Sequence, residues 1–223
     1  MKRITANAIC LFSALGCLGM HGAEEAVQQT DAMARFQGLA KAPWRQVFHD
    51  PCTDNRRDAW QADWFLDGKK ATVTNGPDGM TFTAGPTAGD DSCHAVLWTK
   101  KGFEGDLKIE YEYTRTDRTV RNVTILYIQA TGSGKEPHVR DISTWNALRK
   151  VPSMEIYYNH MNTYHISYAA FGNDGTATKS YIRGRRYMPH KTGLKGTDLD
   201  PDYYPRGLFE TGVKHHITVI KTD

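Results

Sequence analysis

Residues 107–115 read LKIEYEYTR, and this stretch decides the fold class. Apolar or aromatic side chains occupy every second position from Leu107 to Tyr113, and Lys, Glu or Thr fills the positions between them. Successive side chains of a β-strand point to opposite faces of its sheet. The alternation therefore predicts a strand with one face in a core and the other in water.

Further strand patterns follow one another between turn signals. They are residues 71–74, 80–84, 95–99, 123–129 and 214–220, and the turn sequence NGPDG at 75–79 separates the first two. Helix patterns are confined to residues 141–150, with Ser143 as the N-cap, and to a short segment at 31–39. No repeat of fixed period occurs. The chain is predicted to be all-β, a jelly-roll sandwich of two antiparallel sheets.

The N-terminal residues 1–23 have the pattern of a secretory signal peptide. Lys2 and Arg3 precede an apolar stretch, and Gly22 and Ala23 supply small residues for cleavage. The stretch is shorter than the ~20 residues of a membrane-spanning helix, and the residues before Cys17 fit a lipoprotein site poorly. We expect a secreted or periplasmic bacterial protein with no membrane span, a linker or N-terminal decoration at 24–43 and one folded domain at 44–223.

Charge and cysteine content narrow the function classes. Of the formal net charge of +3, two charges belong to Lys2 and Arg3, so the exported chain is nearly neutral. It lacks the basic stripe that a nucleic-acid-binding protein needs. Cys52 and Cys93 remain after the signal and can form one disulfide in an oxidising compartment, with two free thiols as the alternative. No Cys or His spacing predicts a metal site, and no cofactor is expected.

Residues 154–171, MEIYYNHMNTYHISYAAF, combine aromatic and polar side chains in two strand-like runs. Tyrosine rings can stack on the C–H face of a sugar, and His, Asn and Ser can hydrogen bond to its hydroxyls. This composition indicates a carbohydrate-binding sheet, and ordinary packing of Tyr-rich strands is the alternative. Strand parity places His165 and Ser167 on one face and Tyr164, Ile166 and Tyr168 on the other.

The paired acids of a sandwich glycosidase are not evident. Glu155 stands alone in its run, and Glu110 and Glu112 lie on the solvated face of their strand. A polysaccharide lyase instead needs a base and a cation that neutralises a uronate carboxylate. The candidates for these catalytic roles are His165, Tyr168 and Arg115. The candidate substrate-binding residues are Asn162, Ser167, Gln129, His160, Arg183 and Tyr157.

The chain ends soon after its last strand pattern. Residues 221–223, KTD, have the composition of a hairpin turn, but no partner strand follows. A final strand without a partner would expose a sheet edge. We therefore expect the sandwich domain to be incomplete at its C-terminus.

Six segments, in this order, resemble the bacterial family known as domain of unknown function 1961. They are FEGDLKIEYEY, NVTILYIQATG, DISTWNALRK, MNTYHISY, YIRGRRYMPH and HHITVIKTD, and the most specific is MNTYHISY at 161–168. The resemblance covers about residues 44–223 and implies a concanavalin A-like jelly roll and a plant or algal polysaccharide as substrate, including pectic rhamnogalacturonan. It also implies further strands beyond Asp223 and a role for the matching positions Asn162, His165, Ser167 and Tyr168.

Several functions stay open at this point. One is an exported polysaccharide lyase or glycoside hydrolase that acts on a pectic or other acidic glycan. The second is a non-catalytic carbohydrate-binding module, which the absence of paired carboxylates favours, and the third is a structural surface protein. The first two have an oligosaccharide or polysaccharide as the partner.

Overall fold

The computed structural model describes residues 23–120, 123–172, 180–191 and 193–223; the expected signal peptide lies outside these residues except for Ala23. The described chain is mostly β-strand in antiparallel sheets, which confirms the all-β prediction. Its strands are β1 (Trp64–Asp67), β2 (Thr72–Gly76), β3 (Gly79–Thr83), β4 (Val96–Thr99), β5 (Leu107–Thr114), β6 (Thr124–Gly132), β7 (Met161–Ala169), β8 (Tyr181–Tyr187), β9 (Asp198–Tyr203) and β10 (Lys214–Lys221). Its helices are α1 (Ala23–Ala40), α2 (Met154–His160) and the 3₁₀ segments η1 (Ala59–Ala62), η2 (Asp91–Cys93) and η3 (Ile142–Arg149).

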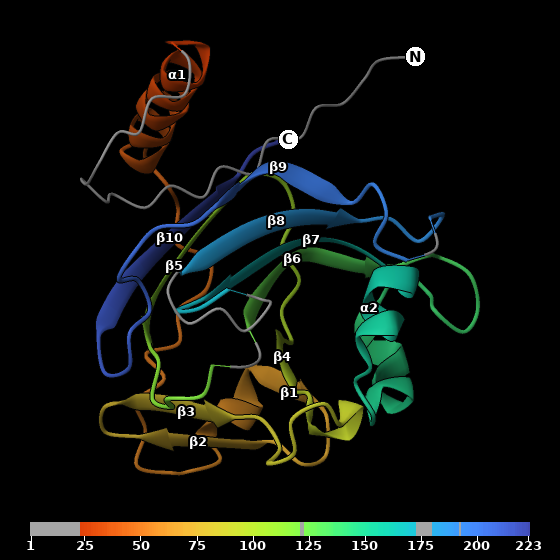
Figure 1. The fold of residues 1–223 in the computed structure, drawn as a ribbon. Helices are drawn as coiled ribbons and strands as arrows, with labels where there is room; N and C mark the ends of the chain where they lie inside the picture. The colour runs from red at the N-terminus through yellow and green to blue at the C-terminus, as the bar shows by residue number, and fades with distance from the viewer. Residues whose placement is uncertain (1–22, 121–122, 173–179, 192) are drawn as a thin grey trace.

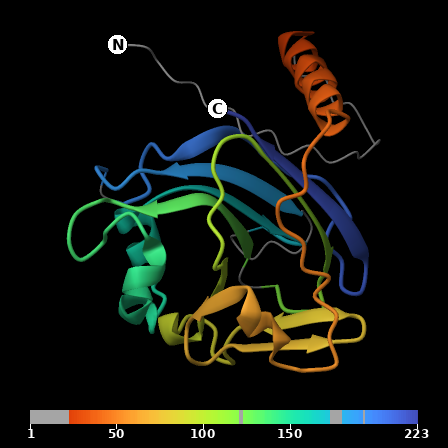
Figure 2. The ribbon, with the colours of Figure 1, turned by 180° about the vertical axis from the view of Figure 1, so that it is seen from behind.

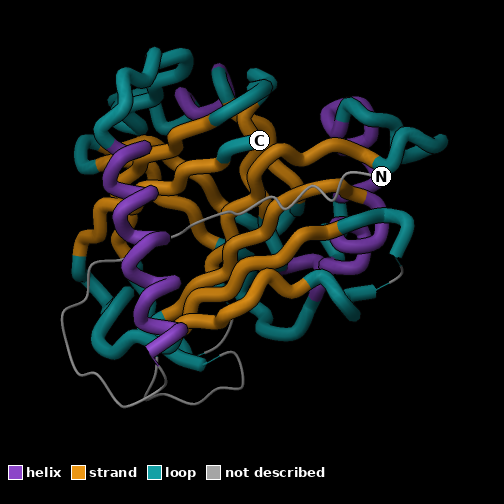
Figure 3. Tube along the Cα trace, turned by 90° about the horizontal axis from the view of Figure 1, so that it is seen from above, coloured by secondary structure: helices purple, strands orange, loops and turns teal. Residues whose placement is uncertain are grey.

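The largest sheet has the strand order β6-β7-β8-β9. It arches over the two short pairs β1–β4 and β2–β3, with α2 at one end of the arch (Figure 1). Seen from behind, β5 and β10 run together along the other side of the molecule (Figure 2). From above, α1 lies along one side of the strands (Figure 3), where Arg35 Nη2 donates to Thr222 Oγ1 at 3.2 Å just beyond β10.

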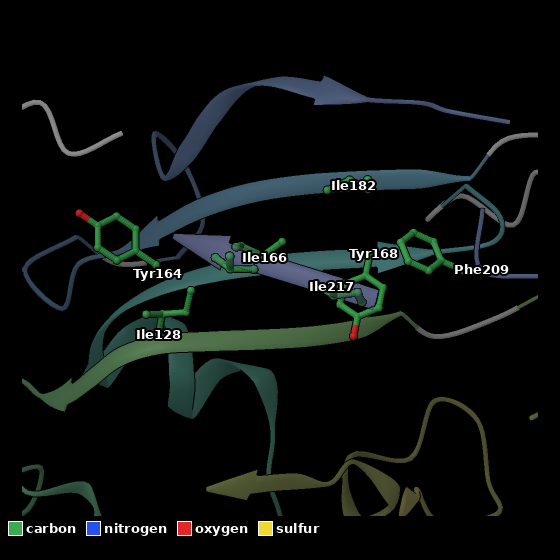
Figure 4. Close-up of a cluster of buried hydrophobic side chains, with 8 residues drawn as sticks. Ile128, Tyr164, Ile166, Tyr168, Ile182, Phe209 and Ile217 are labelled. Atoms are coloured by element: carbon green, nitrogen blue, oxygen red, sulfur yellow. The ribbon is translucent and has the colours of Figure 1, made fainter. Parts of the chain in front are cut away.

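One face of the large sheet, here called the Ile166 face, packs against β5 and β10. The buried side chains of this core are Ile128, Tyr164, Ile166, Tyr168, Ile182, Phe209, Ile217 and Val219 (Figure 4). The alternating apolar residues of β5 pack against the same cluster. The sequence pattern thus fixes which face of β5 turns inward, because burial of apolar area is the dominant favourable contribution to folding.

The opposite face, here called the His165 face, is covered at one end by β1, β4 and α2. Aromatic rings dominate this second core: Trp98 and Tyr157 pack with Tyr127 and Tyr187 from the sheet. The large sheet is therefore apolar on both faces at this end. That arrangement explains why the burial pattern of β7 is nearly continuous rather than alternating.

Asp67, at the end of β1, holds the second core together. Its carboxylate is 1% exposed and accepts hydrogen bonds from Arg149 Nε at 2.6 Å, Trp98 Nε1 at 2.7 Å and the Tyr157 hydroxyl at 3.0 Å. Asn146 Nδ2 donates to its other oxygen at 2.6 Å. A buried carboxylate is tolerated only when it is paired and hydrogen-bonded, and this one joins β1, β4, η3 and α2.

Three sequence-based expectations about local structure are corrected. Residues 154–160 form the helix α2 rather than a strand, because the Ser153 side chain caps its start by accepting from Glu155 N. The helical segment at Ile142–Arg149 is 3₁₀ and its cap is Asp141, not Ser143. The N-terminal helix α1 spans Ala23–Ala40, well beyond residues 31–39, so most of the expected linker is helical.

The last strand also differs from expectation, and of the two alternatives for the cysteines the structure shows free thiols. The strand β10 is not without a partner, since β5 pairs with it over its full length, from Lys214 opposite Thr114 to Lys221 opposite Leu107. Cys52 and Cys93 are both free thiols. The Cys93 thiol instead lies 3.6 Å from Asp90 Oδ2, and burial together with Asp50 raises the pKa of Cys52 to about 11. Within the described residues no helix is both long and apolar enough to cross a membrane.

Candidate functional site

The residues predicted to act together lie on both faces of the large sheet. His165 and Ser167 pair with Tyr127 and Ile125 of β6 and lie on the His165 face. Tyr168 lies on the Ile166 face, where its hydroxyl is 3.1 Å from that of Tyr111 across the sandwich core. The parity drawn from the sequence is therefore correct, and no bulge within β7 brings Tyr168 to the side of His165.

His165 is buried among aromatic rings but keeps one unsatisfied nitrogen. Its side chain is 4% exposed, with ring centroids 5.0 Å from Tyr187 and 5.7 Å from Tyr127. Its Nδ1 has no hydrogen-bond partner in the described part of the chain. Burial, together with the nearby Arg185, lowers the pKa of His165 to about 3. The imidazole is therefore neutral at physiological pH and can accept or donate a hydrogen bond but cannot supply positive charge.

Two buried hydroxyl groups, those of Ser167 and Tyr181, lie on the same face of the sheet as His165. The Ser167 hydroxyl hydrogen bonds to the Tyr181 hydroxyl, and both residues are almost fully buried. Arg183 lies above the Tyr181 ring, with its guanidinium carbon 5.5 Å from the ring centroid. The candidate ligand residue Ser167 is thus satisfied by the protein itself, and Arg183 is the member of this group that reaches solvent.

The accessible polar groups of the His165 face lie at its β8–β9 edge. Arg183 Nε donates to both carboxylate oxygens of Asp202 at 2.9 Å. The Tyr204 hydroxyl donates to Asp202 Oδ2 at 3.0 Å, while the residue as a whole is 52% exposed. A second pair, Arg185 with Asp198 at 2.9 Å, lies further along the two strands. We call Arg183, Asp202 and Tyr204 the edge cluster.

Arg115, the third catalytic candidate, follows β5 and lies beside Tyr168 and Phe171. It forms an ion pair with Asp117 at 3.4 Å, and its guanidinium carbon is 5.2 Å from the Phe171 ring centroid. It lines a small pocket together with Tyr113, Asp117, Thr124, Tyr168 and residues 169–171. The pocket has a volume of about 30 Å³, which is enough for water but not for a sugar ring. Arg115 therefore joins Tyr168 here and not His165.

The remaining predicted ligand residues are scattered. Tyr157 is fully buried and donates to Asp67, so it is a core residue of α2 and not a ligand contact. Gln129 lies at the β6 bulge with φ of 56°, an unusual backbone conformation for a residue with a side chain. His160, at the end of α2 immediately before β7, stacks on His138 with 3.7 Å between ring centroids. Asn162 pairs with Thr131 of β6 and is two residues before Tyr164 in β7, so it is on the Ile166 face and not on the His165 face.

Sequence reasoning missed Asp202 and Tyr204, although a signal for them was present. The runs YIRGRRY at 181–187 and DLDPDY at 198–203 place Arg and Asp at alternate positions. Two antiparallel strands with this pattern can pair their opposite charges across the ladder. The spacing by itself does not identify the two runs as neighbours, and this pairing is what the structure supplies.

The described residues contain no group of three or more His, Cys, Asp or Glu side chains that could hold a metal ion. No protein-family model matches the chain, and no curated protein or solved structure matches it either. The family resemblance noted from the sequence therefore stays a prediction.

Proposed function

We propose that the protein is an exported carbohydrate-active protein whose sandwich is a concanavalin A-like jelly roll and whose β8–β9 edge binds a plant or algal polysaccharide. The observation that carries the proposal is the edge cluster. It combines an exposed aromatic ring with a carboxylate and a guanidinium in a fixed arrangement. Small-molecule sites generally combine an apolar or aromatic surface with a few well-placed polar groups. For a sugar, the aromatic ring can stack on the C–H face, and the polar groups can hydrogen bond to the hydroxyls.

Binding without bond cleavage is the mode that we favour. Elimination needs a base and a neutralising cation at one site. Tyr168 and Arg115 lie on the opposite face of the sheet from His165, so the three catalytic candidates do not converge. Polysaccharide lyase activity is the second candidate function, and the observation in its favour is the neutral His165 with an unpartnered Nδ1 beside Arg185.

The proposal is tested with the full chain on a panel of pectins, alginate, ulvan and neutral plant glycans. Affinity electrophoresis measures binding, and ultraviolet absorbance of unsaturated uronates measures elimination. Tyr204→Ala removes the exposed ring of the cluster, and Phe82→Ala removes a similarly exposed ring, 45% accessible, on β3. We expect retardation by at least one glycan, lost in Tyr204→Ala and kept in Phe82→Ala, without new absorbance.

Two other results decide between the alternatives. Absorbance that grows with time and disappears in His165→Gln would establish the lyase. Absence of both retardation and product on every glycan would overturn the proposal of carbohydrate recognition.

A further inference from the structure

The ring of Tyr204 is held in place although it is exposed. Its hydroxyl is anchored to Asp202 at 3.0 Å, and Asp202 is itself held by Arg183, whose Nε donates to both carboxylate oxygens at 2.9 Å and whose Nη2 donates to Oδ2. Ordering an exposed side chain before a ligand arrives removes part of the entropy loss on binding. Tyr204 therefore presents a fixed, half-exposed flat surface of the kind on which a pyranose ring stacks.

The polar partners of this ring remain accessible. The side chains of Arg183 and Asp202 are 24% and 21% exposed, so their edges meet solvent next to Tyr204. An ionised carboxylate accepts several hydrogen bonds, and a guanidinium has five N–H donors, so each has capacity left after the contacts within the cluster. The pair can therefore accept from one sugar hydroxyl and donate to a neighbouring one.

The charges of this edge are already compensated. Arg183 is paired with Asp202, and Arg185 is paired with Asp198 at 2.9 Å. Hydrogen bonding from Arg183 lowers the pKa of Asp202, so its carboxylate stays ionised at neutral and mildly acidic pH. A uronate carboxylate that approached Arg183 would meet the negative charge of Asp202 at the same place, and like charges at such a distance repel.

We propose that the edge cluster is a subsite for an uncharged sugar residue, with its ring on Tyr204 and two of its hydroxyls on Asp202 and Arg183. This inference rests on the proposed function. It also refines the sequence-based expectation that Arg183 helps to bind an acidic glycan, because the structure shows a partner for its charge within the chain. A pectic chain that contains both neutral and acidic sugars would place a neutral one here.

The test compares galactan and arabinan, which are neutral, with polygalacturonate, which is acidic, by isothermal titration at low and at high salt. We expect the wild-type chain to bind a neutral glycan with little salt dependence, and Tyr204→Ala to weaken that binding about five- to tenfold, the scale of a lost stacking contact. Tyr204→Phe keeps the ring but loses its anchor, and it should weaken binding by about two- to threefold.

Asp202→Asn is the sharper variant, because it removes the compensating charge and leaves Arg183 in place. We expect it to lose affinity for the neutral glycan and to gain salt-sensitive affinity for polygalacturonate. Phe82→Ala is the matched control, and circular dichroism checks that each variant is folded. Wild-type preference for polygalacturonate, lost in Arg183→Gln, would overturn the neutral subsite while leaving carbohydrate binding intact. Failure of all three glycans to bind would count against both proposals.

Discussion

The two faces of β7 use similar aromatic residues for different purposes. On the Ile166 face, Tyr164 and Tyr168 pack with isoleucines from neighbouring strands against β5 and β10, and this core is largely apolar. On the His165 face, His165 and Ser167 are buried as well, but polar groups accompany them out to the edge cluster. The comparison teaches that burial alone does not separate a scaffold face from the face that we propose binds a glycan. The distribution of polar groups and their access to solvent do.

The largest expected effect concerns the polar centre of the second core. Asp67→Ala should lower the free energy of unfolding by about 3–5 kcal/mol, because it leaves the fully buried Arg149 without its partner. Urea denaturation followed by tryptophan fluorescence measures the change. The matched control, Asp198→Ala, breaks a partly exposed ion pair with Arg185 and should change stability by less than about 1 kcal/mol. Equal effects of the two variants would contradict a structural role specific to Asp67.

The Ile166 face should be the next most sensitive region. Ile166→Ala removes a buried side chain from a packed core and should cost about 2–4 kcal/mol of stability, measured by the same denaturation assay. Glycan binding per folded molecule should not change. If binding were lost while stability stayed near that of the wild type, the assignment of this face as scaffold would be wrong.

The pH dependence of stability tests the burial of His165. The pKa of the buried imidazole, about 3, is below the ordinary value of about 6.5 that it regains on unfolding, so the unfolded chain binds the extra proton between these values. Stability is therefore fully present above about pH 6.5 and falls as the pH is lowered toward 3, by about 1.4 kcal/mol per pH unit.

Substitution of His165 separates its effect on the pH dependence of stability from that of other groups that also destabilise the fold at low pH. His138 also has a pKa lowered by burial, so the share of His165 is the difference between the wild type and His165→Gln in a melting series from pH 7 to pH 4.5. His216→Gln, at an exposed position of β10, is the control. Identical pH profiles of the wild type and His165→Gln would show that His165 is not buried in its neutral form.

The smallest expected effect on stability belongs to the edge cluster. Tyr204→Ala removes a ring that is half exposed, so the melting temperature should change little, equivalent to less than about 0.5 kcal/mol. Differential scanning fluorimetry measures this shift alongside the binding assays above. A large destabilisation would place Tyr204 in the scaffold and remove the basis for treating it as a ligand platform.

Local patterns in the sequence were sufficient to predict part of the fold. The alternation at 107–115 correctly predicts the strand β5 and its inward face, and the parity of β7 correctly separates His165 from Tyr168. Both follow from the fixed period of an extended backbone, which needs no information about neighbours. The strand predicted from the aromatic run at 154–159 was wrong, because a short apolar run is compatible with a buried strand or a helix, and the Ser153 cap favours the helix α2.

Only the tertiary structure decided what each polar side chain meets. The alternating charges around Arg183 and Asp202 are visible in the sequence, but only the structure shows that the two runs are the strands β8 and β9 and that they pair in a particular register. The same holds for Asp67 and Arg149, which are 82 residues apart, and for the pairing of β10 with β5. Strand type is a property of a few consecutive residues, whereas charge compensation depends on contacts between segments distant in the chain. For that reason the sequence identified Arg183 as a substrate-binding candidate without showing Asp202, which the fold places beside it.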